Sequence, residues 1–196
     1  MSGNVVLYHK NCSDGFGSAF ILWKCLGNKE TTYHPIQYGD PLPSIDLTAK
    51  SVYILDFSFY SEILTNIARI AHGVYIIDHH KTFDENVTKE IRDLPNVSIF
   101  YRESNSGSVL TNEFCQKHFG DIAPGYIPEI LSYIEDRDLW KWKLPDSEEV
   151  NFAIHSYKQD FQIWDKEVYN KPIDILKSEG SGIVRSNKKL ISGIIA

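Results

Sequence analysis

Three stretches of the chain follow one pattern, a run of β-branched and aromatic residues that stops on a histidine or an aspartate. They are VVLYH at Val5–His9, SVYILD at Ser51–Asp56 and GVYIID at Gly73–Asp78. Such runs are typical of β-strands. Segments with helical character alternate with them, and this alternation predicts an α/β fold with a mostly parallel sheet flanked by helices.

The intervening segments complete this pattern. We predict helices over Phe16–Leu26, Tyr60–Ala71 and Ser106–Phe119, the last with Gly120 just past its end. The segment Thr31–Tyr38 is rich in β-formers but contains Pro35, which predicts an edge strand or an irregular strand, and Asn96–Tyr101 is predicted to be a further strand. In the helix over 60–71 the spacing places these residues on one face: Ile63, Ile67, Ile70 and Ala71.

The C-terminal third carries few strand signals. It predicts helices over Ile127–Ile134, Glu148–Tyr157 and Phe161–Tyr169, and Trp140 and Trp142 are expected to be packing residues. The final stretch contains a Gly/Ser-rich segment around Gly180–Gly182. We therefore predict a core domain over 1–142, a helical extension of that domain over 143–180, and over 181–196 a hinge that could open a second domain.

Composition narrows the class of protein. A chain of 196 residues with 42% hydrophobic and 23% charged residues can bury a core, and it has no apolar run of the roughly 18 residues that a membrane span requires. The N-terminus has no signal-peptide pattern and the three cysteines form no C-x-x-C pair, which favours a cytoplasmic, reducing compartment. The net charge of −6 argues against binding long duplex nucleic acid, whereas a divalent cation could still hold a small phosphate ligand.

The residues at the strand ends are candidate metal ligands. Functional groups gather beyond the carboxyl ends of parallel strands, where this chain has His9, Asp14, Asp56, Asp78, His79 and His80. A mixed nitrogen and oxygen set suits Mn²⁺, Zn²⁺ or Fe²⁺ more than Ca²⁺. Because cysteine pairs are absent, such a site is expected to be catalytic, with positions left open for water and substrate.

These motifs resemble those of the DHH phosphoesterase superfamily. The triplet Asp78-His79-His80 stands in VYIIDHHKT, after the first-strand loop HKNCSDGFGSA and the strand end ILDFS, and before the acidic motif YIEDRDLWKW. Four motifs in order make the resemblance specific. It spans roughly Val5 to Trp142.

The resemblance implies two divalent metals, usually Mn²⁺, with Mg²⁺, Zn²⁺ or Fe²⁺ as alternatives, bridged by an aspartate and by the water that attacks phosphorus. By motif position His9 and Asp14 would be ligands and Asp56 the bridge. His79 would bind the second metal, with Asp138 or Asp136 completing its shell. The catalytic pair would be His80, facing the substrate phosphate, and Asp78, orienting the histidines.

The segment ESNSGSVLTNEF is also similar to a serine-glycine motif of related enzymes that opens a helix. A helix N-terminus can cradle phosphate, so Ser106, Gly107 and Ser108 are candidate substrate contacts.

The chain departs from the family pattern in two places. Many members have two aspartates in the first loop, whereas this loop has only Asp14, which leaves one ligand position to water or Asn11. We interpret Cys12 as a small filler residue. Most members also continue into a C-terminal substrate-binding domain. Here either the sequence stops short of that domain, or a helical tail or a partner subunit closes the cleft. A homodimer is therefore one of the expected arrangements.

Of the two acidic candidates, Asp136 and Asp138, we favour Asp138 as the ligand, since Leu139 follows it.

The sequence therefore predicts a metal-dependent phosphoesterase that hydrolyses a small nucleotide or short oligonucleotide with a metal-activated water. Within the enzyme class, the alternative is a polyphosphate or pyrophosphate hydrolase. Outside it, the alternative is a catalytically weak module that senses a nucleotide.

Overall fold

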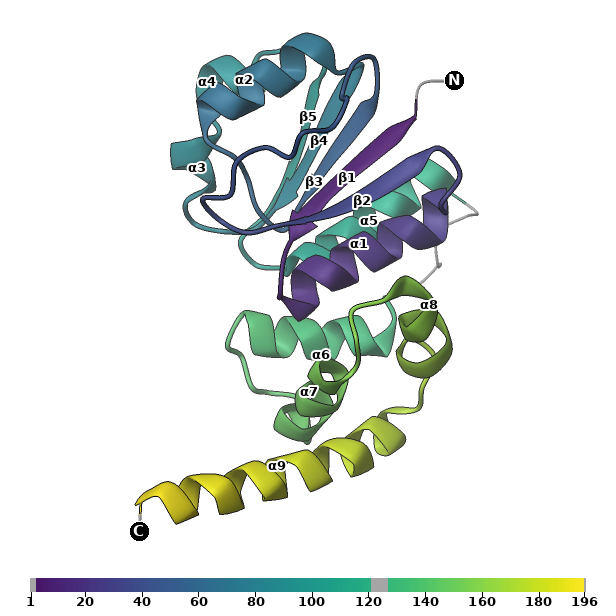
Figure 1. The fold of residues 1–196 in the computed structure, drawn as a ribbon, viewed down its shortest axis with the longest axis vertical. Coiled ribbons are helices and arrows are strands. Elements are labelled where there is room, and N and C mark those ends of the chain that lie inside the picture. The colour runs from purple at the N-terminus through teal and green to yellow at the C-terminus, as the bar shows by residue number, and fades with distance from the viewer. Residues whose placement is uncertain (1–2, 121–126, 196) are drawn as a thin grey trace. The chain divides into compact units, whose positions relative to one another are not determined.

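The computed structural model describes residues 3–120 and 127–195 of the chain (Figure 1). The chain forms two compact units, Met1–Gly125 and Tyr126–Ala196. The boundary that we predicted at residue 142 therefore lies inside the second unit. Each unit is described below by itself.

The first unit is built on a five-stranded sheet. The strands are β1 (Asn4–His9), β2 (Thr31–Ile36), β3 (Ser51–Leu55), β4 (Gly73–Asp78) and β5 (Val97–Tyr101), in the spatial order β2-β1-β3-β4-β5. Every pairing is parallel, which confirms the predicted α/β fold class. Strand β2, which contains Pro35, lies at the edge as predicted, where a missing backbone donor costs least.

Helices cover both faces of this sheet (Figure 1). On one face α1 (Ser13–Leu26) and α5 (Gly107–Phe119) pack side by side, and on the other lie α2 (Ser61–Ile70) and the short helices α3 (Phe83–Asn86) and α4 (Lys89–Arg92). Alternate residues of each strand face opposite layers, so Val5 and Leu7 join the core under α2. The predicted buried face of α2 was wrong at Ile70, which is exposed, because the apolar stripe runs through Leu64, Ile67 and Ala68.

The second unit is helical. It contains α6 (Glu129–Asp138), α7 (Ser147–Ser156), α8 (Phe161–Ile163), which continues as a π-helix over Trp164–Val168, and α9 (Ile173–Ile195). Trp164 is buried in it. The prediction that Trp140 is a packing residue was wrong: Trp140 is 76% exposed, and Trp142 is also exposed, because both follow the end of α6 in left-handed backbone and their rings contact each other.

The predicted hinge is part of α9, which runs without a break through residues 173–195. Gly180 lies where α9 packs against α7: a Cβ atom there would stand 1.7 Å from the carbonyl oxygen of Glu149. The glycine therefore allows two helix backbones to approach closely, which a sequence pattern cannot distinguish from a flexible hinge. No helix within residues 3–120 and 127–195 is both long and apolar enough to cross a bilayer.

Candidate metal centre

The strand register places three predicted ligands level with one another. Tyr8 of β1 pairs with Leu55 of β3, and Leu55 pairs with Ile77 of β4. The next residue of each strand is therefore His9, Asp56 and Asp78, in one row at the carboxyl edge of the sheet. The sequence prediction that these residues converge at one edge is confirmed.

Asp56 lies between two imidazoles. Its Oδ1 atom is 3.1 Å from Nε2 of His79, and its Oδ2 atom is 3.5 Å from Nδ1 of His9. The side chain is 1% exposed, and the backbone has a φ angle of 62°, a left-handed conformation that costs a non-glycine residue about 1 kcal/mol. Strain of this kind is characteristic of functional positions and aims the carboxylate across the edge of the sheet.

Asp14, in the first turn of α1, is held by the N-terminus of α5. Its carboxylate accepts hydrogen bonds from the amides of Gly107 (2.6 Å) and Ser108 (2.9 Å), and its Oδ2 atom lies 3.7 Å from Nε2 of His79. The partial positive charge of the helix end stabilises this buried carboxylate. Asp14 and Asp56 thus approach His79 from two sides.

The serine-glycine motif therefore lies inside this cluster. Ser106 caps α5, and the side chains of Ser106 and Ser108 are 3.1 Å apart and buried. Two amides that we expected to cradle phosphate bind Asp14 in this structure. A Cβ atom on Gly107 would lie 2.7 Å from Oδ1 of Asp56, so this position must be a glycine if Asp56 is to keep its place. The role of these three residues in substrate contact remains a prediction.

Asp78 contacts both histidines that follow it. Its Oδ1 atom accepts hydrogen bonds from the backbone amides of His79 and His80, and it lies 2.8 Å from Nδ1 of the His80 ring. Asp78 is fully buried, whereas the His80 side chain is 32% exposed. This geometry fixes the His80 ring while leaving part of it accessible.

The electrostatics of the cluster suit a cation. Burial, together with nearby His80, lowers the pKa of His9, which favours the neutral imidazole that binds metals. Three buried carboxylates at one edge of a sheet repel one another unless positive charge balances them. The donor set, carboxylate oxygens and imidazole nitrogens within a few ångströms, fits Mn²⁺, Zn²⁺ or Fe²⁺.

The remaining predicted ligands, Asp136 and Asp138, belong to the second unit. Asp136 is 3% exposed and accepts hydrogen bonds from the amides of Lys143 (2.8 Å) and Leu144 (3.2 Å). Burial acts to raise its pKa, but these bonds, a bond from Ser147 and the charge of Lys141 outweigh burial and lower it. Asp138 is the last residue of α6 and is partly exposed. Asp136 is thus engaged within its own unit, which favours Asp138 as the candidate ligand.

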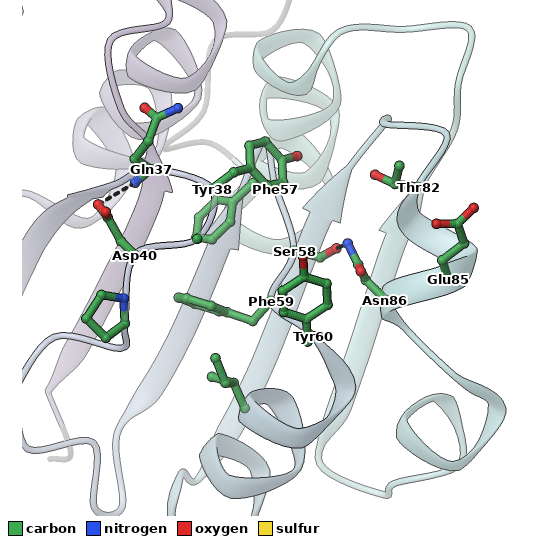
Figure 2. A pocket seen from close by; sticks show the side chains of 13 residues that line it. Gln37, Tyr38, Asp40, Phe57, Ser58, Phe59, Tyr60, Thr82, Glu85 and Asn86 are labelled. Carbon is green, nitrogen blue, oxygen red and sulfur yellow. Dashed lines mark hydrogen bonds between the residues drawn. The ribbon is translucent and has the colours of Figure 1, made fainter.

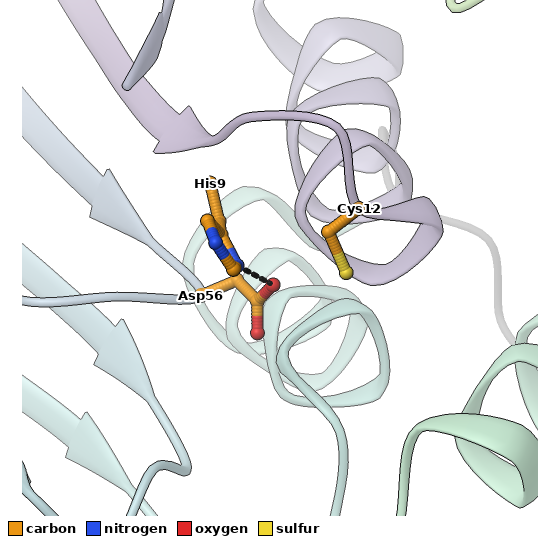
Figure 3. Close-up of side chains that lie close together, drawn as sticks. All are labelled: His9, Cys12 and Asp56. Atoms are coloured by element: carbon orange, nitrogen blue, oxygen red, sulfur yellow. Dashed lines mark ion pairs between the residues drawn. The ribbon is translucent and has the colours of Figure 1, made fainter. Parts of the chain in front are cut away.

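Cys12 is a further candidate ligand that the sequence does not single out. Its sulfur lies beside His9 and Asp56, and the three potential ligand atoms are all within 4.8 Å of one another (Figure 3). From the sequence, Cys12 is interpreted as a small filler residue. Its position between His9 and Asp14 in the first loop was the available signal.

A pocket of about 350 Å³ is lined by residues that include Phe57, which directly follows Asp56 (Figure 2). Its walls include the rings of Tyr38, Phe57, Phe59 and Tyr60, and its polar groups include Gln37, Asp40, Ser58, Thr82, Glu85 and Asn86. The Tyr38 ring lies 5.1 Å from the ring of His9 and 5.8 Å from that of His80, between centroids. Three separate segments form this pocket, so no local sequence pattern could reveal it.

Comparisons with known proteins identify a relative in sequence and a structure with a similar fold, and both proteins are uncharacterized. No family model matches the chain. Uncharacterized protein R106 of Acanthamoeba polyphaga mimivirus is 33% identical over 207 residues, which cover 98% of this chain and 46% of that protein. The crystal structure of an uncharacterized protein from Helicobacter pylori G27 superposes with a TM-score of 0.62 at 12% identity, over 92% of this chain and 62% of that one. The chain thus spans less than half of the viral relative and shares the fold of the bacterial protein.

Proposed function

We propose that this chain is a divalent-metal-dependent phosphoesterase of the DHH type that hydrolyses a phosphoester bond of a small nucleotide or short oligonucleotide. The observation that carries the proposal is the strained, buried Asp56 between His9 and His79 at the carboxyl edge of the sheet. A cytoplasmic location forms part of the proposal.

The residues of the first unit would hold the metal as follows. His9, Asp14, Asp56 and His79 would hold the metal, and the carboxylate of Asp56 would be the shared ligand that faces both histidines. Bound metal would lower the pKa of a coordinated water and balance charge on the phosphoryl oxygens. By motif position Asp138 is the further candidate ligand, and Asp136 is the less favoured one.

Other groups would position the substrate. His80, aligned by Asp78, would face the phosphate. Burial, with the charges of Asp78 and Asp56, raises the pKa of Tyr38, so its hydroxyl keeps its proton at neutral pH and can donate a hydrogen bond to an anionic ligand.

The pocket supports a nucleotide over polyphosphate. Aromatic walls can stack on a base, and stacking contributes about 1–3 kcal/mol per base. Among the described residues that line the pocket there are two carboxylates, Asp40 and Glu85, and no lysine or arginine. A chain of phosphates would be repelled there, whereas a nucleotide can place its base in the pocket and its phosphate at the metal centre. Polyphosphate or pyrophosphate remains the alternative substrate, and nucleotide sensing the alternative function.

Hydrolysis assays test this proposal. The full chain, with Mn²⁺ added, is expected to cleave bis-p-nitrophenyl phosphate and a dinucleotide, and Asp56→Asn and His79→Asn are each expected to lose at least 10³-fold in kcat/KM, about 4 kcal/mol. The matched controls Asp93→Asn and His72→Asn change exposed residues of the same unit and should keep full activity. A folded, metal-loaded wild type without turnover would contradict the enzyme proposal and favour the sensor.

A further inference from the structure

The environment of Asp56 has two sides with different chemistry. On the Oδ1 side lie His79 and, beyond it, Asp14. On the Oδ2 side lies His9. The carboxylate of Asp14 is bonded to the amides of α5, and the further potential ligand atom beside His9 and Asp56 is the sulfur of Cys12 (Figure 3).

We propose that Cys12 is a metal ligand on the His9 side of Asp56, and that its sulfur gives this half of the centre a preference for thiophilic divalent cations. The inference rests on the metal centre of the proposed function and adds a ligand and a metal class to it. Zinc, cobalt and cadmium are the expected occupants of this half, ahead of manganese or magnesium.

The distances among the three side chains come close to those around one ion. Nitrogen or oxygen ligands at about 2.1 Å and a thiolate at about 2.3 Å from a metal lie about 3.6 Å apart at tetrahedral angles and about 4.4 Å apart in opposite positions. The His9 and Asp56 atoms are 3.5 Å apart, and the sulfur of Cys12 lies within 4.8 Å of both. A small rotation of the Cys12 side chain would bring its sulfur within binding distance of an ion held by His9 and Asp56.

The loop backbone holds Cys12 toward this position. Asn11 has a φ of 57°, which turns the chain after β1, and Cys12 is the N-cap residue directly before the 14-residue helix α1. A Cβ atom on Gly15 would lie 2.3 Å from the carbonyl oxygen of His9, so the first turn of α1 is packed tightly against the end of β1. The N-terminal end of a helix also favours a negatively charged sulfur.

The chemistry of binding is simple. The metal replaces the proton of the Cys12 thiol, which leaves to solvent, and a metal–sulfur bond forms without any change in oxidation state. The partial exposure of Cys12 gives an ion access to the sulfur. The site then carries two anionic ligands, Cys12 and Asp56, and one neutral ligand, His9.

Cobalt absorbance tests the inference without relying on activity. The metal-free full chain, titrated with Co²⁺, is expected to develop a sulfur-to-cobalt charge-transfer band in the near ultraviolet. The band should be absent in Cys12→Ser and Cys12→Asp and retained in Cys25→Ala, a matched change of another partly buried cysteine. In competition, Cys12→Asp should lose at least tenfold in its preference for Cd²⁺ over Mn²⁺ while it retains Mn²⁺ binding.

Each outcome separates this inference from the proposed function. Cobalt binding by the wild type without the charge-transfer band, or a band that persists in both Cys12 variants, would overturn the role of Cys12 and leave the metal centre intact. Failure of a folded wild type to bind Co²⁺, Cd²⁺ or Mn²⁺ would overturn the metal centre itself. Cys12→Asp serves as the second variant if Cys12→Ser folds poorly.

Discussion

Asp56 in the first unit and Asp136 in the second are both buried carboxylates, 1% and 3% exposed, yet their surroundings differ in kind. Asp56 faces the ring nitrogens of His9 and His79, which are metal-binding groups. Asp136 faces the backbone amides of Lys143 and Leu144, which close the turn after α6. The comparison teaches that burial alone does not identify a ligand, and that the partners of a carboxylate separate a binding role from a structural one.

Asp14 shows that one carboxylate can combine the two environments. Its carboxylate accepts hydrogen bonds from two backbone amides of α5, and its Oδ2 atom also lies 3.7 Å from Nε2 of His79. Backbone donors can therefore orient a proposed ligand as well as close a turn, and the feature that distinguishes the two cases is the nearby imidazole.

The largest expected effect is on Asp56 itself. Asp56→Asn should abolish metal-dependent hydrolysis but leave the metal-free chain as stable as the wild type or slightly more so, because asparagine tolerates left-handed backbone and removes a buried charge. Thermal unfolding in a chelator, together with kcat/KM, measures both. A fall in stability of 2 kcal/mol or more would mean that Asp56 is structural and would remove the contrast with Asp136.

Gly107→Ala should reduce activity about 100-fold, because the new methyl group would stand 2.7 Å from Oδ1 of Asp56 and displace it. The control is Gly182→Ala in α9, where nothing lies within 4 Å of the new methyl group and stability should rise by about 0.5–1 kcal/mol. Steady-state kinetics and urea unfolding test the pair. Unchanged activity in Gly107→Ala would show that the exact position of Asp56 does not matter.

The two aspartates of α6 should respond in opposite ways. Asp136→Asn is expected to cost about 2 kcal/mol of stability, because a buried carboxylate loses charge-assisted bonds from two amides, and to leave the specific activity of the folded protein intact. Asp138→Asn should keep stability and lose activity. The reverse result, measured by unfolding and kinetics, would assign the ligand role to Asp136.

The stabilising effect of Asp136 should also depend on pH. Its pKa is lower in the folded chain than in the unfolded chain, so the charged form stabilises the fold above the unfolded value of about 3.9, and this contribution disappears as the pH falls through the folded pKa. The stability difference between wild type and Asp136→Asn should therefore be constant near neutral pH and shrink below about pH 4. A difference that grows on acidification would contradict this account.

The smallest effect is expected at the pocket. Tyr60 is 68% exposed at its rim, and Tyr60→Ala should raise the KM for a dinucleotide about tenfold, with kcat little changed, if the ring stacks on a base. The control is Ile70→Ala, a change of an exposed residue at the C-terminal end of α2, the helix that Tyr60 precedes. Equal KM values in the two variants would argue that the base does not use this pocket.

The sequence sufficed for the sheet and for most of the cluster because both depend on local patterns. Runs of β-formers mark the strands, and parallel pairing then brings His9, Asp56 and Asp78 level without further information. What could not be predicted depends on contacts between distant segments. The sequence around Gly180 predicts a hinge, whereas the structure shows that this glycine packs against the backbone of Glu149. The choice between Asp136 and Asp138 depends on the turn after α6, in which the amides of residues 143 and 144 donate hydrogen bonds to Asp136.

Cys12 illustrates the same limit at short range. Its distance of three residues from His9 was visible in the sequence, but the left-handed turn at Asn11 that brings its sulfur beside Asp56 was not. The aromatic pocket requires three segments to meet and was invisible for the same reason.

The most direct test of the central claim is the anomalous scattering of crystals of the full chain grown with Mn²⁺. We expect a manganese peak about 2.2 Å from a carboxylate oxygen of Asp56, in contact with at least one of His9 and His79. A structure in which Asp56 contacts no metal at saturating Mn²⁺, or in which the ion binds only elsewhere, would contradict the assignment of this strand edge as a metal centre.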